Sequence, residues 1–564
     1  MQETEWIVAE VPEGVSPDAA GRHGLPFILR VLLAQRGFTD AAQLEPFLRP
    51  RLSDLRDPFE LPDMDLAVRR ILQAVDSSEP VCVFGDYDVD GITSVTILSG
   101  LLSEYGLKVQ PFIPIRGEEG YGLSDPAAER CLGSEPRPSL LITVDCGTAS
   151  GEQIQRLAAE GIDVIVVDHH ETGPGGRPPA VAVVNPKLGD DYGYLCSAGV
   201  VFKLAHALLK TRRIEGVDLK NILDLVAVAT VADIVPLVDE NRILVRHGLR
   251  RLPQTVNLGL NALMEVSGVS GYASSSDVGF RIGPRINAAG RMDAPEDALK
   301  ALMTDCEEMA ASMAEQLDEH NRRRQKHEQQ MHEEALGLLE EGSASDGEPV
   351  IVVGSRQWHP GVVGIVASKL MRTYHKPSFV IAFGEDGFGK GSGRSIEGVS
   401  LVDAIDACRV LLEAGGGHHM AAGISLHEAK LDEFREAFGN YVLETTTAES
   451  RRPRLHIDAE VPFEELSLDF LASYELLQPF GSGNPQPVFM SRDVWLTDSP
   501  RHLKNKHLRL ALRQGIVERD AMFFGAGGRE LPDPPWDVAF TIDRNFFRGR
   551  LSLQMSVKDI RRSQ

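Results

Sequence analysis

The sequence predicts a multidomain α/β protein with a helix-covered parallel sheet, a smaller α/β unit beyond a long helix, and a C-terminal barrel of short strands. Three observations predict this fold class. Short β-branched runs alternate with amphipathic stretches between residues 81 and 270, no glycine or proline occurs from Glu296 to Leu336, and several short strands follow residue 487. The first pattern is typical of a parallel sheet with helices on both faces, and the last is typical of a small barrel.

Length and composition are those of an ordinary globular protein. The chain has 564 residues, of which 43% are apolar and 25% charged, and this length suggests about three or four domains. The formal charge of −24 excludes a generally basic nucleic-acid-binding coat, so a polyanion would need local basic patches or bound cations. No apolar run could span a membrane, the first residues lack a signal pattern, and the six cysteines form no CxxC pair. We therefore expect a cytoplasmic protein with free thiols and no membrane contact.

Five buried strands are expected in the first α/β unit, at 81–84, 109–115, 140–144, 164–167 and 181–184. Amphipathic stretches such as 94–104 and 152–160 predict the helices between them. Acidic residues follow several of these strands, and parallel sheets bind their ligands at the carboxyl ends of the strands. The candidate site is therefore expected at that edge of the sheet.

The rest of the chain is divided into a connecting helix, a second α/β unit and the barrel. One helix is expected over 296–336; it is polar on every face from 318 to 330, which is typical of a spacer that crosses solvent. The second unit has expected strands at 350–353 and 378–383, helices at 361–374 and 401–413, and the glycine-rich 415–418. Barrel strands are expected at 487–497, 507–513, 520–524, 538–543 and 550–557, and a helix near the start at 26–33.

The most informative motif is Gly85-Asp86-Tyr87-Asp88-Val89-Asp90-Gly91, directly after the first strand. In an extended loop its three carboxylates point the same way. Their mutual repulsion is unfavourable unless a cation neutralises it. Taken alone, the motif is compatible with either a solvated turn or a metal site.

Other element ends add acids and imidazoles to the same edge. Asp145 follows the third strand, Asp168-His169-His170 follows the fourth, and Asp233 follows the apolar stretch 225–231. Carboxylate and imidazole ligands together suit Mn²⁺ or Mg²⁺. At least five such groups are present, enough for two ions, which in phosphoryl transfer activate a water and stabilise the departing oxygen.

The motifs resemble those of the DHH phosphoesterase superfamily, and are most similar to those of the RecJ family of bacterial single-stranded-DNA exonucleases. The four signatures are GDYDVDG (85–91), TVDCG (143–147), VDHH (167–170) and ATVADIVPL (229–237). Further similar segments lie at 112–124, 281–293, 358–370, 391–395, 416–423 and 478–489. The resemblance therefore covers nearly the whole chain from about Pro80.

The resemblance implies a domain organisation and an activity. The domains would be an N-terminal helical segment (1–50), a DHH catalytic domain (51–290), the long connecting helix (291–345), a DHH-associated domain (346–446) and a single-strand-binding OB-fold (452–564). The activity would be metal-dependent hydrolysis of single-stranded DNA from 5′ to 3′ into 5′-mononucleotides, in DNA recombination and repair. Besides single-stranded DNA, the implied partners are single-strand-binding protein and a RecQ-type helicase, and a monomer is expected.

The family's metal ligands can be carried over to this sequence residue by residue. They fall on Asp88, Asp90, Asp145, His169 and Asp233, with Asp145 between two ions of Mn²⁺ or Mg²⁺. Asp86 either ligates a metal or orients the loop. His170 either supports the ligands or donates a hydrogen bond to the scissile phosphate.

The resemblance also implies substrate contacts. They are Arg116 at the 5′ end, and Arg285, Asn287, Arg291, His359, Arg394, Ser395 and His418 around the nucleotide and its phosphates. Simpler interpretations exist for some of them, because Arg116 could pair with Glu118 and Glu119, and His359 could cap the helix that follows. The glycines before His418 could likewise form an ordinary tight turn.

Two clusters in the C-terminal unit mix basic and aromatic residues. Their members include Lys504, Lys506, Arg509, Phe546 and Arg548. They form either an ordinary surface hairpin or, in an OB-fold, a surface that stacks bases and follows phosphates.

Two other functions are compatible with part of the pattern. A phosphodiesterase for short oligonucleotides or cyclic dinucleotides would resemble the first two domains but lack the long helix and the barrel. A non-catalytic replication scaffold would have lost catalytic acids, whereas this chain keeps all five implied metal ligands. The sequence therefore favours the exonuclease.

Overall fold

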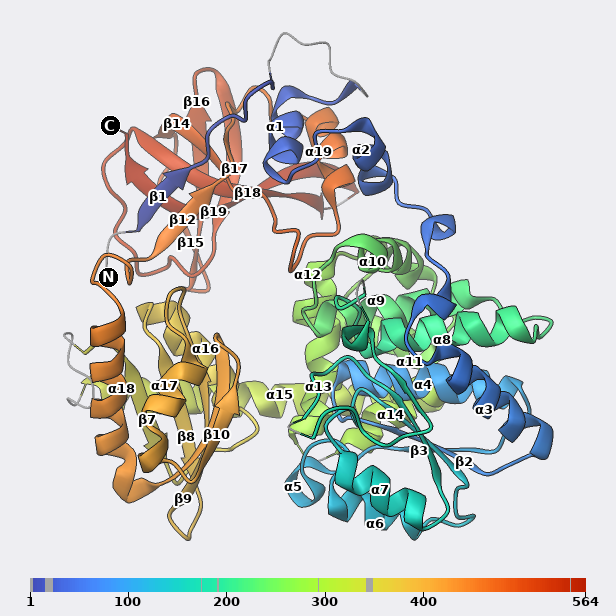
Figure 1. The fold of residues 1–564 in the computed structure, drawn as a ribbon. Helices are drawn as coiled ribbons and strands as arrows, with labels where there is room; N and C mark the ends of the chain where they lie inside the picture. Colours follow the sequence, from blue (N-terminus) through green and yellow to red (C-terminus); the bar gives the residue numbers. More distant parts are fainter. Residues whose placement is uncertain are drawn as a thin grey trace.

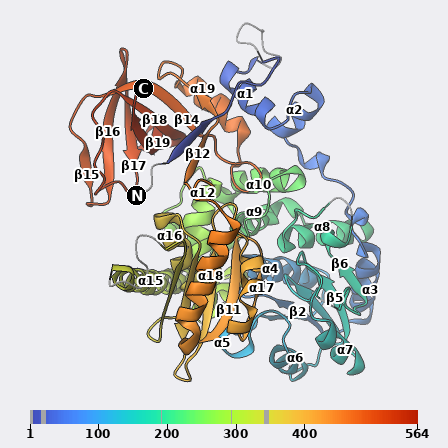
Figure 2. The same ribbon diagram turned by 60° about the vertical axis from the view of Figure 1, so that its left-hand side comes forward.

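Three large sheets occupy three parts of the molecule, with two α/β lobes side by side and a barrel above them (Figure 1). Figure 2 shows the same arrangement from a second direction. The structure, a computed structural model, describes residues 4–15, 24–173, 175–189, 192–292, 294–340, 348–547 and 549–563. Within these residues, no helix combines the length and the apolar composition that a bilayer-spanning segment needs.

The first lobe is built on a five-stranded parallel sheet with the order β3-β2-β4-β5-β6. Its strands are β2 (Val81–Gly85), β3 (Val109–Phe112), β4 (Leu140–Val144), β5 (Asp163–Val167) and β6 (Ala182–Val184). All five expected strands are confirmed, with small shifts at their ends. The order reverses between β2 and β4, and ligands of such sheets bind at that reversal, beyond the carboxyl ends of the strands.

Helices cover both faces of this sheet because consecutive strand residues point to opposite sides. Val81 and Val83 pack in one buried cluster with the helices α3, α4, α8 and α9, and Cys82 and Phe84 pack in another with α6 and α7. The helices of the lobe are α3 (Met64–Ser77), α4 (Val89–Glu104), α5 (Arg116–Glu119), α6 (Asp125–Leu132), α7 (Gly151–Ala159), α8 (Ser197–Thr211), α9 (Leu223–Ala232), α10 (Asp239–Arg251), α11 (Leu258–Ser267), α12 (Ser275–Asp277) and α13 (Gly283–Arg291). The central strands β2 and β4 are therefore buried along their whole length.

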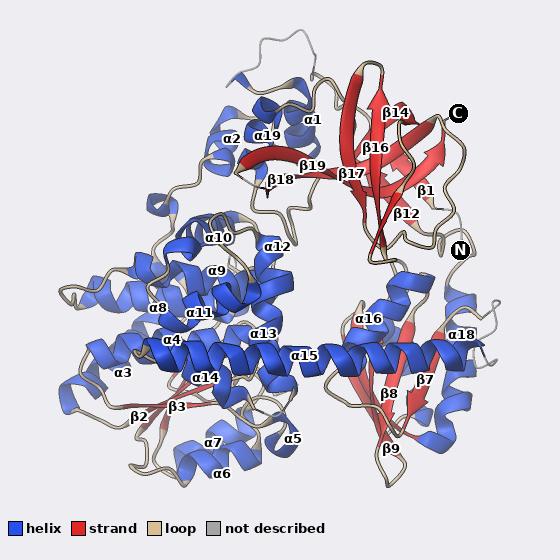
Figure 3. Cartoon of the chain, turned by 180° about the vertical axis from the view of Figure 1, so that it is seen from behind, coloured by secondary structure: helices blue, strands red, loops and turns tan. Residues whose placement is uncertain are grey.

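The connecting segment is two helices and not the single helix that the sequence predicts. The helix α14 (Pro295–Met303) ends at Thr304, and α15 (Glu307–Leu338) begins after Cys306. Both residues are extended, and the Thr304 hydroxyl accepts a hydrogen bond from the Cys306 amide at 3.2 Å. A threonine side chain that offers the backbone such a bond competes with the helix. The correction shortens the spacer to α15, which crosses between the lobes (Figure 3).

The second lobe has a mixed sheet with the order β10-β11-β9-β8-β7, in which only β7 and β8 are parallel. Its elements are β7 (Ile351–Ser355), α16 (Val363–Tyr374), β8 (Ser378–Phe383), β9 (Phe388–Arg394), α17 (Leu401–Ala407), β10 (Ala414–Gly417), β11 (Ala421–His427) and α18 (Leu431–Thr445). The helix α16 and the end of α15 pack on one face, and α17 and α18 pack on the other. The glycine-rich segment, for which an ordinary tight turn was one interpretation, forms the strand β10.

The barrel closes because β14 pairs with both β18 and β16. The ring runs β14-β18-β19-β17-β16, and only β17 and β19 in it are parallel. Its strands are β14 (Phe489–Leu496), β16 (His507–Gln514), β17 (Val517–Phe523), β18 (Trp536–Phe547) and β19 (Arg550–Arg562), with the short β13 (Ala459–Glu460) and β15 (Arg501–Leu503) at its margins. Three meandering strands and a final hairpin closed in this order are the OB-fold.

The first part of the chain packs against the barrel, far from its neighbours in sequence. The strand β1 (Glu5–Val8) pairs in parallel with β12 (Arg454–Ile457). The helices α1 (Phe27–Gln35) and α2 (Ala41–Leu48) share a buried cluster with α19 (Leu468–Tyr474) and the barrel strands. The helix expected near the start is confirmed, but its partners are residues more than 400 positions away.

Candidate active site

The candidate site lies where β2, β4 and β5 end. Each strand is buried along its length and is followed at once by an acid, namely Asp86, Asp145 and Asp168. Because the three strands are adjacent and parallel, their ends bring these carboxylates to one edge. The end of α9 delivers a fourth acid, Asp233, to the same place.

The loop after β2 is held by the start of α4. Asp88 is the N-cap of this helix, and its Oδ1 accepts hydrogen bonds from the amides of Asp90 and Gly91 at 2.9 and 3.1 Å, as N-cap carboxylates do. Gly91 packs against the backbone of Asp86, where a Cβ would collide with the Asp86 carbonyl. The glycine that ends the motif therefore allows the strand and the helix to approach closely enough to group the three acids.

Asp90 is anchored by the N-terminus of α8. Its two oxygens accept hydrogen bonds from the amides of Ser197 and Ala198 at 2.7 and 2.8 Å, where the helix presents unpaired donors and positive potential. The Ser197 hydroxyl also donates to Asp145 Oδ1 at 3.0 Å. Sequence reasoning missed Ser197, because it lies in no acidic motif.

The acids converge on His169. Its Nε2 lies 3.4 Å from Asp145 Oδ1, 3.5 Å from Asp233 Oδ2 and 3.9 Å from Asp90 Oδ2. Three overlapping groups each have potential ligand atoms within 4.8 Å of one another, and together they contain the six residues predicted for the metal centre and His170, which was predicted as a supporting or phosphate-donating residue; the six are Asp86, Asp88, Asp90, Asp145, His169 and Asp233. The structure therefore brings the predicted set together.

The donor set fits divalent cations. Within the described residues, Asp86 Oδ1, His169 Nε2 and Asp233 Oδ2 are buried and have no hydrogen-bond partner, and buried polar atoms are rarely left so. Burial and Asp88 raise the pKa of Asp86 to about 8, and burial with Asp90 raises that of Asp233 to about 8. Burial lowers the pKa of His169 to about 4, which leaves a neutral imidazole able to ligate. A cation would relieve both the unpaired atoms and the crowding of like charges.

Asp168 orients the two imidazoles and was not among the predicted site residues. Its Oδ1 accepts hydrogen bonds from the His169 amide at 2.7 Å and lies 2.8 Å from His170 Nδ1, and its Oδ2 accepts one from the Thr148 amide. Although burial opposes it, the bond with His170 holds the pKa of Asp168 well below its usual range, and Asp168 raises the pKa of His170. On the far side, His170 Nε2 lies 3.0 Å from the Tyr121 hydroxyl.

We expect Asp168→Asn to lower kcat by about 10- to 100-fold, the usual cost of removing a group that orients metal ligands. Asparagine keeps one acceptor oxygen, so its NH2 group would face either the two histidines or the Thr148 amide, which are all served by acceptors in the wild type, and the negative charge that raises the pKa of His170 is lost. Steady-state kinetics and calorimetric titration of Mn²⁺ measure the two expected losses. Wild-type values for both kcat and metal affinity would contradict this role.

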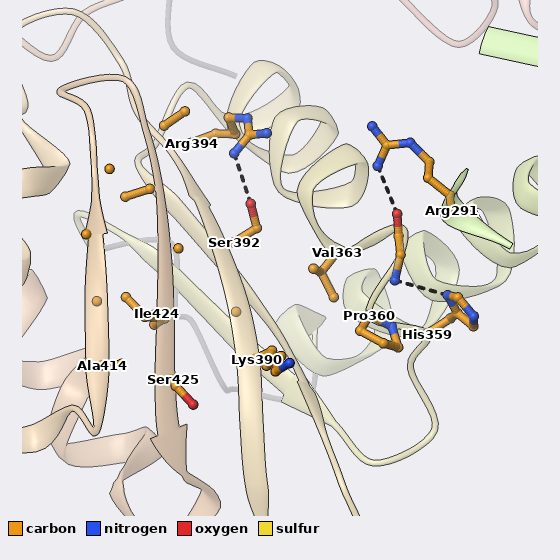
Figure 4. A pocket seen from close by; sticks show the side chains of 18 residues that line it. Arg291, His359, Pro360, Val363, Lys390, Ser392, Arg394, Ala414, Ile424 and Ser425 are labelled. Carbon is orange, nitrogen blue, oxygen red and sulfur yellow. Dashed lines mark hydrogen bonds between the residues drawn. The ribbon is translucent and has the colours of Figure 1, made fainter. Parts of the chain in front are cut away.

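A cavity of about 940 Å³ lies in the second lobe, on the side of α13 (Figure 4). Its lining includes Lys390, Ser392 and Arg394 from β9, glycines of β10, and His359 and Arg291. Arg394 donates to the Ser392 hydroxyl at 2.9 Å, and Arg291 donates to the Gly361 carbonyl at 2.9 Å. Guanidinium and ammonium groups beside glycine backbone are suited to phosphate.

Two predicted residues of this region are placed differently. Ser395 is buried, and its hydroxyl donates to the Val399 carbonyl at 2.7 Å instead of lining the cavity. The alternation of β9 puts residues 390, 392 and 394 on the cavity side, so Ser392 and Lys390 take that place. His418 lies at the turn after β10, beside Gly417 of the lining but not in it. The two-residue period of a strand is the sequence signal that could have identified Ser392 and Lys390 as lining residues.

The remaining predicted contacts are spread more widely. Asn287 accepts a hydrogen bond from the Val89 amide in the acidic loop at 3.2 Å. Arg285 is paired with Asp318 of α15 at 2.8 Å, so contact with a phosphate would require it to leave that pair. His359 accepts a bond from the Gly361 amide at 3.0 Å, in the loop before α16, whose N-cap is Val362 and has no side-chain cap, so His359 does not cap the helix itself. The side chain of Arg116 lies outside the described residues.

The sequence matches three protein families. They are the DHH family, N-terminal domain, at residues 80–230, the DHHA1 domain at 347–444 and the RecJ OB domain at 457–559. The first two families and the acid–histidine cluster define a phosphoesterase of the DHH class.

The similarity to individual proteins extends over the whole chain. Single-stranded-DNA-specific exonuclease RecJ of Dickeya dadantii is 36% identical over 563 residues, covering 95% of this chain and 96% of the relative. RecJ of Bacillus subtilis is 36% identical over 537 residues, covering 94% and 67%. The crystal structure of RecJ from Thermus thermophilus in complex with Mn²⁺ superposes with a TM-score of 0.83 at 30% identity, covering 100% of this chain and 80% of that one. The chain belongs to the RecJ family.

Proposed function

We propose that the protein is a metal-dependent exonuclease that hydrolyses single-stranded DNA from 5′ to 3′ and releases 5′-mononucleotides. The observation that carries this proposal is the convergence of acids and imidazoles at one sheet edge, with three buried ligand atoms that have no partner in the described residues. The related Thermus thermophilus structures hold Mn²⁺ and Mg²⁺. Mn²⁺ or Mg²⁺ is accordingly the cofactor, and the number of ligands is sufficient for two ions.

The chain's own residues position the reacting groups. Asp88, Asp90, Asp145, His169 and Asp233 hold the cations, which when bound supply Lewis acidity at the phosphate and acidify a water. His170, oriented by Asp168 and kept protonatable by it, is placed to donate a hydrogen bond to a phosphate oxygen at the edge of the cluster. A donor directed at developing negative charge lowers the barrier of phosphoryl transfer.

The cavity of the second lobe supports selection of the strand end. On α13, Asn287 is bonded to the acidic loop and Arg291 lines the cavity, and four residues of helix rise only about 6 Å. A terminal phosphate held by Arg394, Lys390 and Ser392 would leave the next phosphodiester near the acids. We assign this cavity to the 5′ phosphate, which gives the direction of digestion.

The barrel supplies a second contact with the strand. A cavity of about 720 Å³ lies on the barrel and is lined by Leu503, Arg509 and Leu551, together with Glu518, Arg519 and Asp520 of β17. Lys504 and Lys506 are exposed and have no ion-pair partner among the described residues, and Phe546 is 72% exposed. Arg509 is paired with Asp520 at 2.8 Å, and Arg548 lies outside the described residues. The loops of OB-folds bind oligonucleotides.

The triple variant K504A/K506A/F546A is expected to bind a 30-nucleotide strand about tenfold more weakly, because it loses two phosphate contacts and one stacking surface. The salt dependence of binding should also become shallower. Fluorescence anisotropy at several salt concentrations measures both, and hydrolysis of a very short strand should not change. The double variant K220A/K430A, which removes two lysines elsewhere, is the control; equal losses in both variants would contradict the assignment.

One experiment tests the activity and its polarity together. Strands labelled at either end, with and without a 5′ phosphate, are digested in Mn²⁺, in Mg²⁺ and after chelation. We expect early release of 5′-labelled mononucleotide, with the 3′ label retained in shortening products. Preferential cleavage of dinucleotides would favour the short-oligonucleotide phosphodiesterase, and release of the 3′ label first would overturn the proposed direction.

We also propose the cellular setting that the family resemblance implies. The protein acts in the cytoplasm as a monomer in DNA recombination and repair, beside single-strand-binding protein and a RecQ-type helicase. Sedimentation of the purified chain and co-purification with each candidate partner test these statements.

A further inference from the structure

Another cavity lies beside the acidic cluster and extends to the barrel. It has a volume of about 520 Å³ and is lined by Ile234 after α9, Phe280 before α13, Arg372 of α16, and Phe480, Gln486 and Asp543 from the C-terminal part. All three parts of the molecule therefore contribute to its wall. The residue before Ile234 is Asp233, and Asn287, which is bonded to the acidic loop, also lines this cavity.

Ile234 has a backbone conformation that is rare for its residue type. Its φ is 61°, in the left-handed region where a β-branched side chain is strained. Its side chain is nevertheless 73% exposed, so burial of its apolar surface does not offset the strain. Strained residues of this kind cluster at functional sites, and this one lies beside a metal-site acid.

Phe280 is presented by an irregular turn of helix. It lies in the π-helical segment Val278–Ile282, whose end residues Val278 and Ile282 are fully buried while Phe280 is 78% exposed. A π-helical turn changes the direction of its side chains relative to an α-helix, and such turns are frequent at functional sites. An exposed aromatic ring and an exposed isoleucine thus face one cavity next to the acids.

The other wall is charged. Arg372 is exposed and has no ion-pair or hydrogen-bond partner within the part of the chain that the structure describes. Asp543 lies toward the barrel, where it accepts a hydrogen bond from Gln486 at 3.0 Å. A phosphate would therefore be attracted to the α16 side and repelled from the Asp543 side.

We propose that Ile234 and Phe280 form a stacking platform for the nucleobases of the strand on the 3′ side of the scissile phosphate, with Arg372 contacting the phosphates between them. The inference rests on the proposed function and extends it, because it assigns the segment between the metal site and the barrel. Apolar and aromatic surfaces accept any base, whereas the cation follows the backbone. The platform therefore fixes the position of the scissile bond without selecting a sequence.

Two variants test the platform without risk to the fold. Phe280→Ala removes an exposed ring, and Ile234→Gly removes the side chain while relieving the left-handed strain, so its melting temperature should not fall. We expect Phe280→Ala to reduce kcat/KM on a 20-nucleotide strand by about tenfold, the effect of one lost base–aromatic contact, and Ile234→Gly to reduce it in the same direction, while Phe280→Trp keeps wild-type activity. Phe388→Ala, an exposed phenylalanine of β9 outside this cavity, is the matched control.

Single abasic sites placed at successive positions of the strand locate the platform. The wild type should slow when the abasic site occupies the cavity, a fixed number of nucleotides from the cleaved bond, and Phe280→Ala should lose this position dependence. Wild-type kcat/KM and a wild-type abasic profile in both Phe280→Ala and Ile234→Gly would overturn the inference. Failure of the wild type itself to cut any single strand would instead overturn the proposed function.

Discussion

Replacing Asp145 with asparagine is expected to reduce hydrolysis of single-stranded DNA by at least about 10³-fold, because it removes the negative charge of a carboxylate that belongs to two of the three candidate ligand groups. Asp145 has a φ of 61°, a conformation that asparagine tolerates, and the asparagine oxygen can still accept the bond from Ser197. The fold and the affinity for a long strand should therefore remain. Rates with saturating Mn²⁺ and anisotropy with an oligonucleotide measure the two quantities separately.

The matched control is Asp65→Asn on α3, which removes an acid from an exposed pair with Arg69. It should keep wild-type rates, because such surface pairs contribute little. Activity of Asp145→Asn within tenfold of the wild type in Mn²⁺ would show that this carboxylate is not essential for holding the ions.

Removing the metal is expected to make the stability of the protein depend strongly on pH. The raised pKa values, about 8 for Asp86 and Asp233 and about 6 for Asp90, lie above those of the unfolded chain. Protonation of these groups therefore favours the folded state below about pH 4, and this contribution is lost as the pH rises through 6 to 8. The metal-free protein should melt about 5–10 °C lower at pH 8.5 than at pH 5.5.

Mn²⁺ should reverse this dependence, because cations bind the ionised carboxylates and a neutral imidazole. Thermal melts with and without Mn²⁺ at the two pH values should show the larger stabilisation at pH 8.5. Asp145→Asn provides the internal control, since its site carries one charge fewer and should lose stability less steeply with pH. An equal melting temperature of the metal-free protein at both pH values would contradict the claim that repulsion among the ionised carboxylates destabilises the fold at high pH.

The sequence could predict the metal centre because its residues follow directly after buried strands. The positions of β2, β4 and β5 along the sequence and their burial can be read from their apolar runs, and parallel strands of one sheet place their carboxyl ends at the same edge. Asp88, Asp145 and His169 then need no further information to meet. Their anchors were harder to predict: Ser197 acts through a helix N-terminus that becomes a partner of Asp90 only after the chain has folded.

The sequence predicted the structure less well where a single hydrogen bond, an unpredicted strand or a long-range strand pairing decides it. The break before α15 depends on a single threonine hydroxyl, which residue-by-residue helix propensity does not resolve. The phosphate cavity depends on which side of β9 faces inward, and no strand was predicted over β9, so the regular alternation of its glycines with larger residues was not used. The pairing of β1 with β12 leaves no local signal, because each strand is only four residues long.

The pairing of β1 with β12 has a consequence for how the enzyme is made. During translation, the helices α1 and α2 are synthesised long before the barrel against which their apolar sides pack. These apolar sides therefore have no native partner until the last fifth of the chain is synthesised. Contacts between such distant residues slow folding, and exposed apolar surface in the interval invites chaperone binding or aggregation. Once formed, the same contacts join the barrel to the first lobe through the segment between α2 and α3, in addition to its link to the second lobe between α18 and β12, and two such links limit the independent movement of the barrel.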